Sequence, residues 1–307
     1  MFLLDMQKIF GLPILIAILL ASIFPYIGLS LINISVYLLI FLMYLSISHV
    51  NLNFNFKKGT LTNLFNKDLL VGILLLFIIY PLIQFLLAKL LIKNQYYVYG
   101  LTFASLTPIA IVAPYFTSLH QGNKEFSFSF MLVSMVICPF LAPIILYLLF
   151  NGRVDFNLFP IIKILLLVFI TPLFILVITN KWLPSLKKTI NKHQASLNSV
   201  CLSLLIFILI GAAYGKMQTN YISLEMIIKI LLIAIFQDFV VYFLSLKLLS
   251  KFKFKKTISI SVSMKNIAIA ANILLFYTPQ AAIPVCLIFV IHALFFNYLG
   301  FAGSKLP

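Results

Sequence analysis

The sequence predicts an all-α integral membrane protein of ten transmembrane helices, arranged in two inverted five-helix repeats. Three observations support this fold class. Apolar residues make up 63% of the 307 residues and charged residues 9%, with a mean hydropathy of +1.16, whereas soluble domains are about half apolar and about a quarter charged. A helical crossing needs about 20 residues, so the chain has room for roughly ten spans. Finally, an interrupted span occupies the fourth place in each half.

The first repeat, residues 1–150, contains spans one to five. Its opening segment shares features with a signal peptide, but Asp5 lies where a basic region is needed, the apolar run is long and no convincing cleavage site follows. A polar stretch at 51–68, with phenylalanines spaced among lysines, is typical of a segment that lies along the membrane surface. The five expected spans are 8–26, 31–49, 69–91, 97–119 and 126–150.

The fourth span is predicted to be broken near the bilayer midplane. Pro108 and Pro114 lie six residues apart in its middle. Proline lacks a backbone donor and clashes with the preceding turn, so a helix is interrupted where two prolines fall close together. Irregular backbone at this depth is tolerated only where protein or a water-filled cavity surrounds it.

The second repeat, residues 151–307, contains spans six to ten after a polar stretch at 151–157. A basic segment at 181–193 carries Trp182 and is expected to lie at the membrane surface. Span eight carries Gln237 and Asp238 deep inside it. The five expected spans are 159–179, 196–214, 221–249, 257–277 and 281–299.

The ninth span carries Lys265 and Asn266 in the middle of an apolar run. An ionisable residue inside a span is costly and is by default a functional hypothesis. The alternative is a lysine that snorkels to the surface. Lys265 lies about eight residues, or roughly 12 Å of helix, from the nearer end of the run, which is further than its stem comfortably reaches.

The two interrupted spans hold matching positions in halves of five spans each. An odd number of spans per repeat gives the halves opposite orientations in the membrane. Paired interrupted segments in inverted halves mark the midplane site of a transporter. Most lysines between the spans fall on the side of the N-terminus, which places both termini in the cytoplasm and the protein in the cytoplasmic (inner) membrane.

Composition also excludes several classes of protein. The net charge of +16 comes from lysines between apolar runs, not from a nucleic-acid-binding pattern. The three cysteines lie in apolar segments without disulfide or metal-ligand spacing, so we expect no metal and no cofactor. The four histidines are scattered and no catalytic constellation is recognisable, so we do not expect an enzyme. No protein partner is indicated.

The chain resembles the sodium/bile-acid symporter family, within the bile/arsenite/riboflavin transporter superfamily. The resemblance rests on the proline-centred fourth span at 104–119, the end of the fifth span at 134–147 with Ala142 and Pro143, and the ninth and tenth spans at 261–292. It implies a ten-helix transporter with a panel of spans one, two, six and seven. A core of spans three, four, five, eight, nine and ten would hold the crossing of the broken spans four and nine.

The side chains that bind sodium in this family are largely replaced here, so the sodium sites are degenerate. Ser127 and Asn266 match the family, whereas a glutamate, two glutamines, a Ser-Asn pair and a threonine do not. By our alignment the glutamate falls on Ser261, the two glutamines on Lys265 and Leu76, the Ser-Asn pair on Ala113 and Pro114, and the threonine on Met131. A hard cation needs several oxygen ligands, so we expect no sodium coupling.

We expect the ammonium of Lys265 to replace a bound cation. Asp238 is the only acid well inside a span and is the candidate partner of Lys265; the alternative is that it hydrogen-bonds its neighbours. His292 aligns with a family histidine and is expected to be a packing residue rather than a proton carrier. The candidate substrate and ion site comprises Thr107, Pro108, Ser127, Asp238, Ser261, Ser263, Lys265, Asn266 and His292.

The expected function is sodium-independent, alternating-access transport of a small organic anion, with coupling to protons or no coupling. Helix N-termini at two broken spans, together with Lys265, make a positive environment for a carboxylate. Membrane lipid is the other expected partner. The alternatives are a sodium-coupled symporter of the bile-acid type and a passive channel or facilitator, which would need a continuous polar path.

Overall fold

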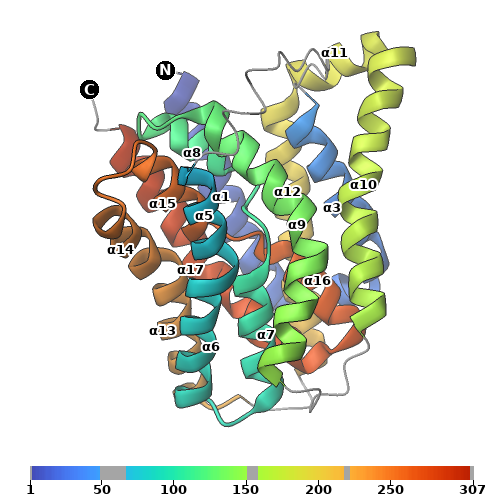
Figure 1. The fold of residues 1–307 in the computed structure, drawn as a ribbon. Coiled ribbons are helices and arrows are strands. Elements are labelled where there is room, and N and C mark those ends of the chain that lie inside the picture. The colour runs from blue at the N-terminus through green and yellow to red at the C-terminus, as the bar shows by residue number, and fades with distance from the viewer. Residues whose placement is uncertain (1, 49–66, 151–157, 218–221, 305–307) are drawn as a thin grey trace.

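The computed structural model describes residues 2–48, 67–150, 158–217 and 222–304, and their regular structure is helical apart from one isolated β-bridge (Figure 1). Most of the expected surface segment at 51–68 and the polar stretch at 151–157 lie outside these ranges. Shorter apolar helices cover Pro13–Ile23, Ile32–Ile47 and Ile267–Tyr277. Helices long and apolar enough to cross a membrane cover Lys67–Leu91, Lys124–Phe150, Ile162–Trp182, Ser196–Lys216, Leu224–Leu248 and Pro279–Gly303. The chain is therefore an integral membrane protein.

One group of helices packs around α12. α12 (Gln194–Met217) contacts α1 (Phe2–Ile23), α2 (Pro25–Ser30) and α3 (Ile32–Ile47), and α3 also contacts α10 (Leu158–Trp182). Figure 1 shows α3 and α10 side by side. The short α11 (Pro184–Lys192) follows α10. These helices cover the expected spans one, two, six and seven.

The remaining helices pack around α17 (Pro279–Ser304), which contacts α7 (Gln95–Leu106), α13 (Leu224–Ile235) and α16 (Ile267–Tyr277). α7 approaches α17 so closely that a Cβ on Gly100 would overlap the carbonyl oxygen of Ala281. α7 starts where it does because the Asn94 side chain accepts hydrogen bonds from the backbone N–H groups of Tyr96 and Tyr97.

Two spans contain a π-helical turn that the sequence did not predict. The third consists of α5 (Lys67–Leu74), the π-segment η1 (Leu75–Ile79) and α6 (Tyr80–Leu91). The eighth consists of α13, the π-segment η2 (Phe236–Val240) and α14 (Val241–Leu248). η1 ends just before Pro81, which cannot donate the regular helical hydrogen bond. π-turns inside helices are frequently found at functional sites.

Both spans predicted to be broken are split into two helices. The fourth consists of α7 and α8 (Ala113–Leu119), and the ninth of α15 (Lys255–Ser263) and α16. α9 (Lys124–Phe150) packs beside α7, α8 and α15. The N- and C-termini lie at the end of the molecule where α11 lies, and the connection from α6 to α7 lies at the opposite end (Figure 1).

Candidate substrate and ion site at the helix crossing

The two interrupted segments meet through their backbones. After α7 the chain is extended at Thr107, and after α15 it is extended at Met264. Ala110 N donates to the carbonyl of Met264 at 2.7 Å, and Asn266 N donates to the carbonyl of Pro108 at 2.9 Å. Ile109 and Lys265 thereby form an antiparallel bridge. The structure thus brings together the two breaks that the sequence predicts.

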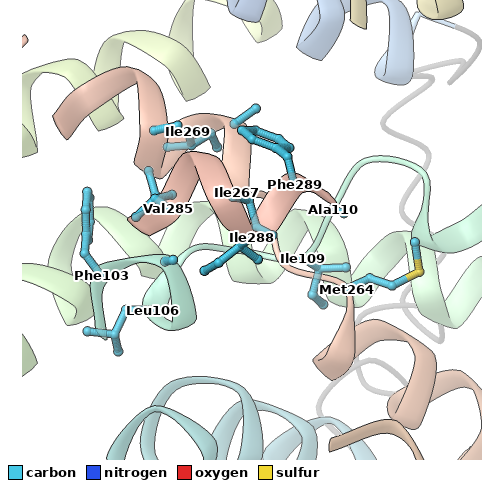
Figure 2. Close-up of a cluster of buried hydrophobic side chains, with 14 of the residues drawn as sticks. Phe103, Leu106, Ile109, Ala110, Met264, Ile267, Ile269, Val285, Ile288 and Phe289 are labelled. Carbon is cyan, nitrogen blue, oxygen red and sulfur yellow. The ribbon is translucent and has the colours of Figure 1, made fainter. Parts of the chain in front are cut away.

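Apolar side chains enclose this crossing. Phe103, Ile109, Met264, Ile267 and Ile288 are almost completely buried around it, and Figure 2 shows them gathered from the two links, α7, α16 and α17. Burial lowers the local dielectric constant, which strengthens the electrostatic effect of any charge placed there.

Lys265 lies at the bridge with its ammonium directed at η1. Its Nζ donates to the carbonyl oxygen of Leu76 at 2.7 Å and lies 6.0 Å from the centre of the Phe77 ring. The side chain is buried, with 2% exposed, so Lys265 does not snorkel. Among the residues that the structure describes, no carboxylate forms an ion pair with it.

Asp238 pairs with His292 and not with Lys265, which corrects the candidate pairing drawn from the sequence. His292 Nδ1 lies 3.0 Å from Asp238 Oδ2, and both side chains are buried. The Gln237 amide interacts with the carboxylate, although neither Asp238 Oδ1 nor Gln237 Nε2 makes a hydrogen bond of normal geometry. Gln84 Nε2 donates to Gln237 Oε1 at 2.9 Å. His292 is thus part of a buried polar pair.

Three hydroxyl groups form a second buried cluster beside the crossing. Ser127 Oγ lies 3.2 Å from Ser261 Oγ, and Thr117 Oγ1 donates to Ser127 Oγ at 3.1 Å. Ser127 and Ser261 were predicted from the sequence, whereas Thr117 was missed. No motif marks Thr117, which faces Ser127 only because α8 packs against α9.

The remaining predicted site residues differ in their hydrogen bonds. Thr107 Oγ1 donates to the carbonyl of Ala104 and Ser263 Oγ to that of Ile260, so each hydroxyl bonds within its own helical segment. Pro108 contributes its carbonyl to the bridge. Asn266 is buried, and its Nδ2 has no hydrogen-bond partner. An unsatisfied buried donor is a position where a ligand or water can bind.

A cavity of about 70 Å³ lies at the crossing. Lys265, Asn266 and His292 are the polar residues in its lining. Apolar residues make up the remaining walls: Ile14 from α1, Leu202 and Ile206 from α12, Ala110, Ile111 and Val112 before α8, Ile267 and Ala268 from α16, and Phe289, Ala293 and Phe296 from α17. The cavity therefore lies between α1 and α12 on one side and the crossing with α17 on the other.

Four of the positions where our alignment expects a sodium ligand of the family are buried. Leu76, Ala113 and Met131 expose at most 1% of their side chains, and Pro114 is also buried. Leu76 lacks a side-chain oxygen, but its backbone carbonyl accepts the hydrogen bond from Lys265. Among the described residues, no group of three or more His, Cys, Asp or Glu side chains could hold a metal ion.

The comparisons with known proteins agree with the resemblance seen in the sequence. The sequence model of the sodium bile acid symporter family matches residues 36–222, more than half of the 307 residues. A comparison with curated proteins finds no match. The matched region includes α7, α8 and α9 and ends before Lys265. The chain is thus a membrane protein that belongs to the sodium bile acid symporter family.

Proposed function

We propose that this protein is a secondary transporter that moves a small organic anion across the cytoplasmic membrane without sodium. The observation that carries the proposal is the buried ammonium of Lys265, bonded to the Leu76 carbonyl at the bridge between the two broken spans. A fixed ammonium there supplies the positive charge that a bound cation would otherwise bring. Sodium is then unnecessary.

The cavity suits a carboxylate at its polar end. Lys265 brings an amine to the crossing, the free Nδ2 of Asn266 offers a hydrogen-bond donor, and α16 begins at Ile267 with the positive end of its dipole at the crossing. A hydrogen bond to a charged acceptor is about twice as strong as a neutral one. The apolar walls then accommodate the rest of the anion.

The location of the cavity supports alternating access. It lies between α1 and α12 of the proposed panel and the crossing with α17 of the proposed core. In transporters built from inverted repeats, one bundle rocks against the other around a site at the bilayer midplane. We therefore assign residues 1–150 and 151–307 to the two repeats, and place both termini in the cytoplasm.

The test is anion uptake into liposomes that contain the purified protein. A thermal-shift screen of organic acids first selects the test anions. Uptake should proceed equally with and without a sodium gradient in wild-type protein. Uptake that needs a sodium gradient would favour the sodium-coupled symporter. Uptake that only equalises the anion concentration inside and outside the liposomes, whatever ion gradient is applied, would favour a passive facilitator.

A further inference from the structure

The Asp238–His292 pair joins the interior of the protein to the cavity. Asp238 lies in η2 and exposes none of its side chain, whereas His292 in α17 lines the cavity with Lys265 and Asn266. Because His292 Nδ1 faces Asp238 Oδ2, Nε2 is the ring nitrogen left for a water molecule in the cavity. The cavity where the substrate is proposed to bind is thus a route by which a proton can reach the pair.

The surrounding helices supply few other charges. Lys265 is the cation that shares the cavity with His292, while Gln84 and Gln237 next to Asp238 are neutral amides. The packed elements also carry charged side chains, none of which lines the cavity or forms an ion pair with Asp238 or His292 among the described residues: Lys89 in α6, Lys216 in α12, Glu225 and Lys229 in α13, Lys247 in α14, and Lys255 and Lys256 in α15. Their other titratable groups are phenols and thiols, among them Tyr80 in α6, Tyr99 in α7, Tyr115 in α8, Tyr242 in α14, and Cys286 and Tyr298 in α17. The charge of this region is thus set by Lys265, Asp238 and His292.

The three groups give a simple charge balance. With a neutral imidazole, the ammonium of Lys265 and the carboxylate of Asp238 sum to zero. One proton on His292 makes the sum +1, and a bound monoanion returns it to zero. Unpaired charge is costly inside a membrane, so the empty site and the site with proton and anion are both favoured over the site holding only one of them.

We infer that the Asp238–His292 pair is a proton-binding site that couples anion transport to an equal number of protons. The inference rests on the proposed function, because it names the coupling ion of the same cavity. The proton binds His292 Nε2 and the resulting imidazolium is held by the Asp238 carboxylate. Each ligand raises the affinity for the other, as linkage requires, and the joint movement carries no net charge.

The first test needs no substrate. Infrared difference spectra of the purified protein, recorded between about pH 8 and about pH 5, detect protonation of imidazole side chains. We expect a reversible imidazole signal that His292→Gln removes and Asp238→Asn displaces. His120→Gln is the matched control, because His120 is also buried but bonds to the carbonyl of Leu299 outside the cavity. A signal unchanged in His292→Gln would overturn the inference.

The second test uses proteoliposomes with labelled pyruvate, 2-oxoisovalerate and cholate as test anions. An interior more alkaline by about one pH unit should drive about tenfold accumulation, while a potential set with valinomycin and potassium should have no effect. Asp238→Asn and His292→Gln should lose this accumulation, whereas His120→Gln should keep both the accumulation and the exchange of internal for external anion. If the wild-type protein exchanges the anion but a pH gradient drives no accumulation, proton coupling is refuted and the proposed function stands. If uptake requires sodium, the proposed function itself is refuted.

Discussion

The ammonium of Lys265 donates a hydrogen bond of 2.7 Å to the backbone carbonyl of Leu76. Our alignment places a side-chain amide of the family at each of these two positions, 189 residues apart in the chain. Here one position supplies the amine of Lys265 and the other an apolar side chain with an accepting carbonyl. A contact between these two positions is what the proposed replacement of the ion by the lysine predicts.

Sodium should not stabilise the protein. A specifically bound ion at about 100 times its dissociation constant stabilises the native state by about 2.7 kcal/mol. We therefore expect equal melting temperatures in detergent when sodium replaces choline, measured by scanning fluorimetry. A sodium-specific increase of several degrees that Ser261→Ala removes would show that the hydroxyl cluster of Thr117, Ser127 and Ser261 still binds the ion.

Gly100→Ala should destabilise the packing of α7 on α17. The added Cβ would overlap the carbonyl oxygen of Ala281, a backbone atom that cannot turn away. Overpacking of this kind costs about 1–3 kcal/mol, so the melting temperature should fall by several degrees. Gly215→Ala is the control, because its new Cβ would meet Leu29 Cδ2 at an ordinary 3.5 Å. Equal melting temperatures for the two variants would contradict the close contact between the two helices.

Labelling should show which side of the membrane each link faces. Single cysteines at the exposed Lys188, Lys253 and Lys93 would be introduced after replacement of Cys138, Cys201 and Cys286. An impermeant maleimide should label positions 188 and 253 only from the cytoplasmic side and position 93 only from outside. Cysteines at Lys58 and Arg153, which lie outside the described residues, should follow the same rule, from the cytoplasm and from outside respectively. The reverse pattern would invert the proposed orientation.

The sequence predicts the breaks in the fold better than the contacts of the site. Prolines at 108 and 114 and the polar pair at 265 and 266 interrupt long apolar runs, and these local signals are enough to place the ends of α7 and α15. The partners of the site come from segments far apart in the chain. That Asp238 bonds to His292 and Lys265 to a carbonyl depends on how η1, η2 and α17 are rotated and packed.

The π-turns explain in part why the contacts of the site were harder to predict than the breaks in the fold. They have no strong signal in composition, yet η1 directs the Leu76 carbonyl at Lys265 and η2 contains Asp238. Thr117 was missed for a similar reason, since a hydroxyl in an apolar helix usually bonds to its own backbone. A polar residue can be located within a span from sequence, but its partner across the fold cannot.

The central claim is that Lys265 supplies the charge that an ion would otherwise bring, and uptake by Lys265→Met tests it most directly. Two unit charges about 4 Å apart interact by about 4 kcal/mol near a protein surface, so loss of the ammonium should lower the initial rate of anion uptake at least about tenfold in sodium-free buffer. Lys265→Arg should restore only part of the rate, because the guanidinium is larger and planar.

Lys216→Met provides the matched control for this measurement. Its ammonium also donates to a backbone carbonyl, that of Leu275 at 2.8 Å, but Lys216 does not line the cavity. We predict normal uptake by Lys216→Met and strongly reduced uptake by Lys265→Met at every pH. Normal uptake by Lys265→Met across the same pH range would show that the lysine has no part in transport and would contradict the account.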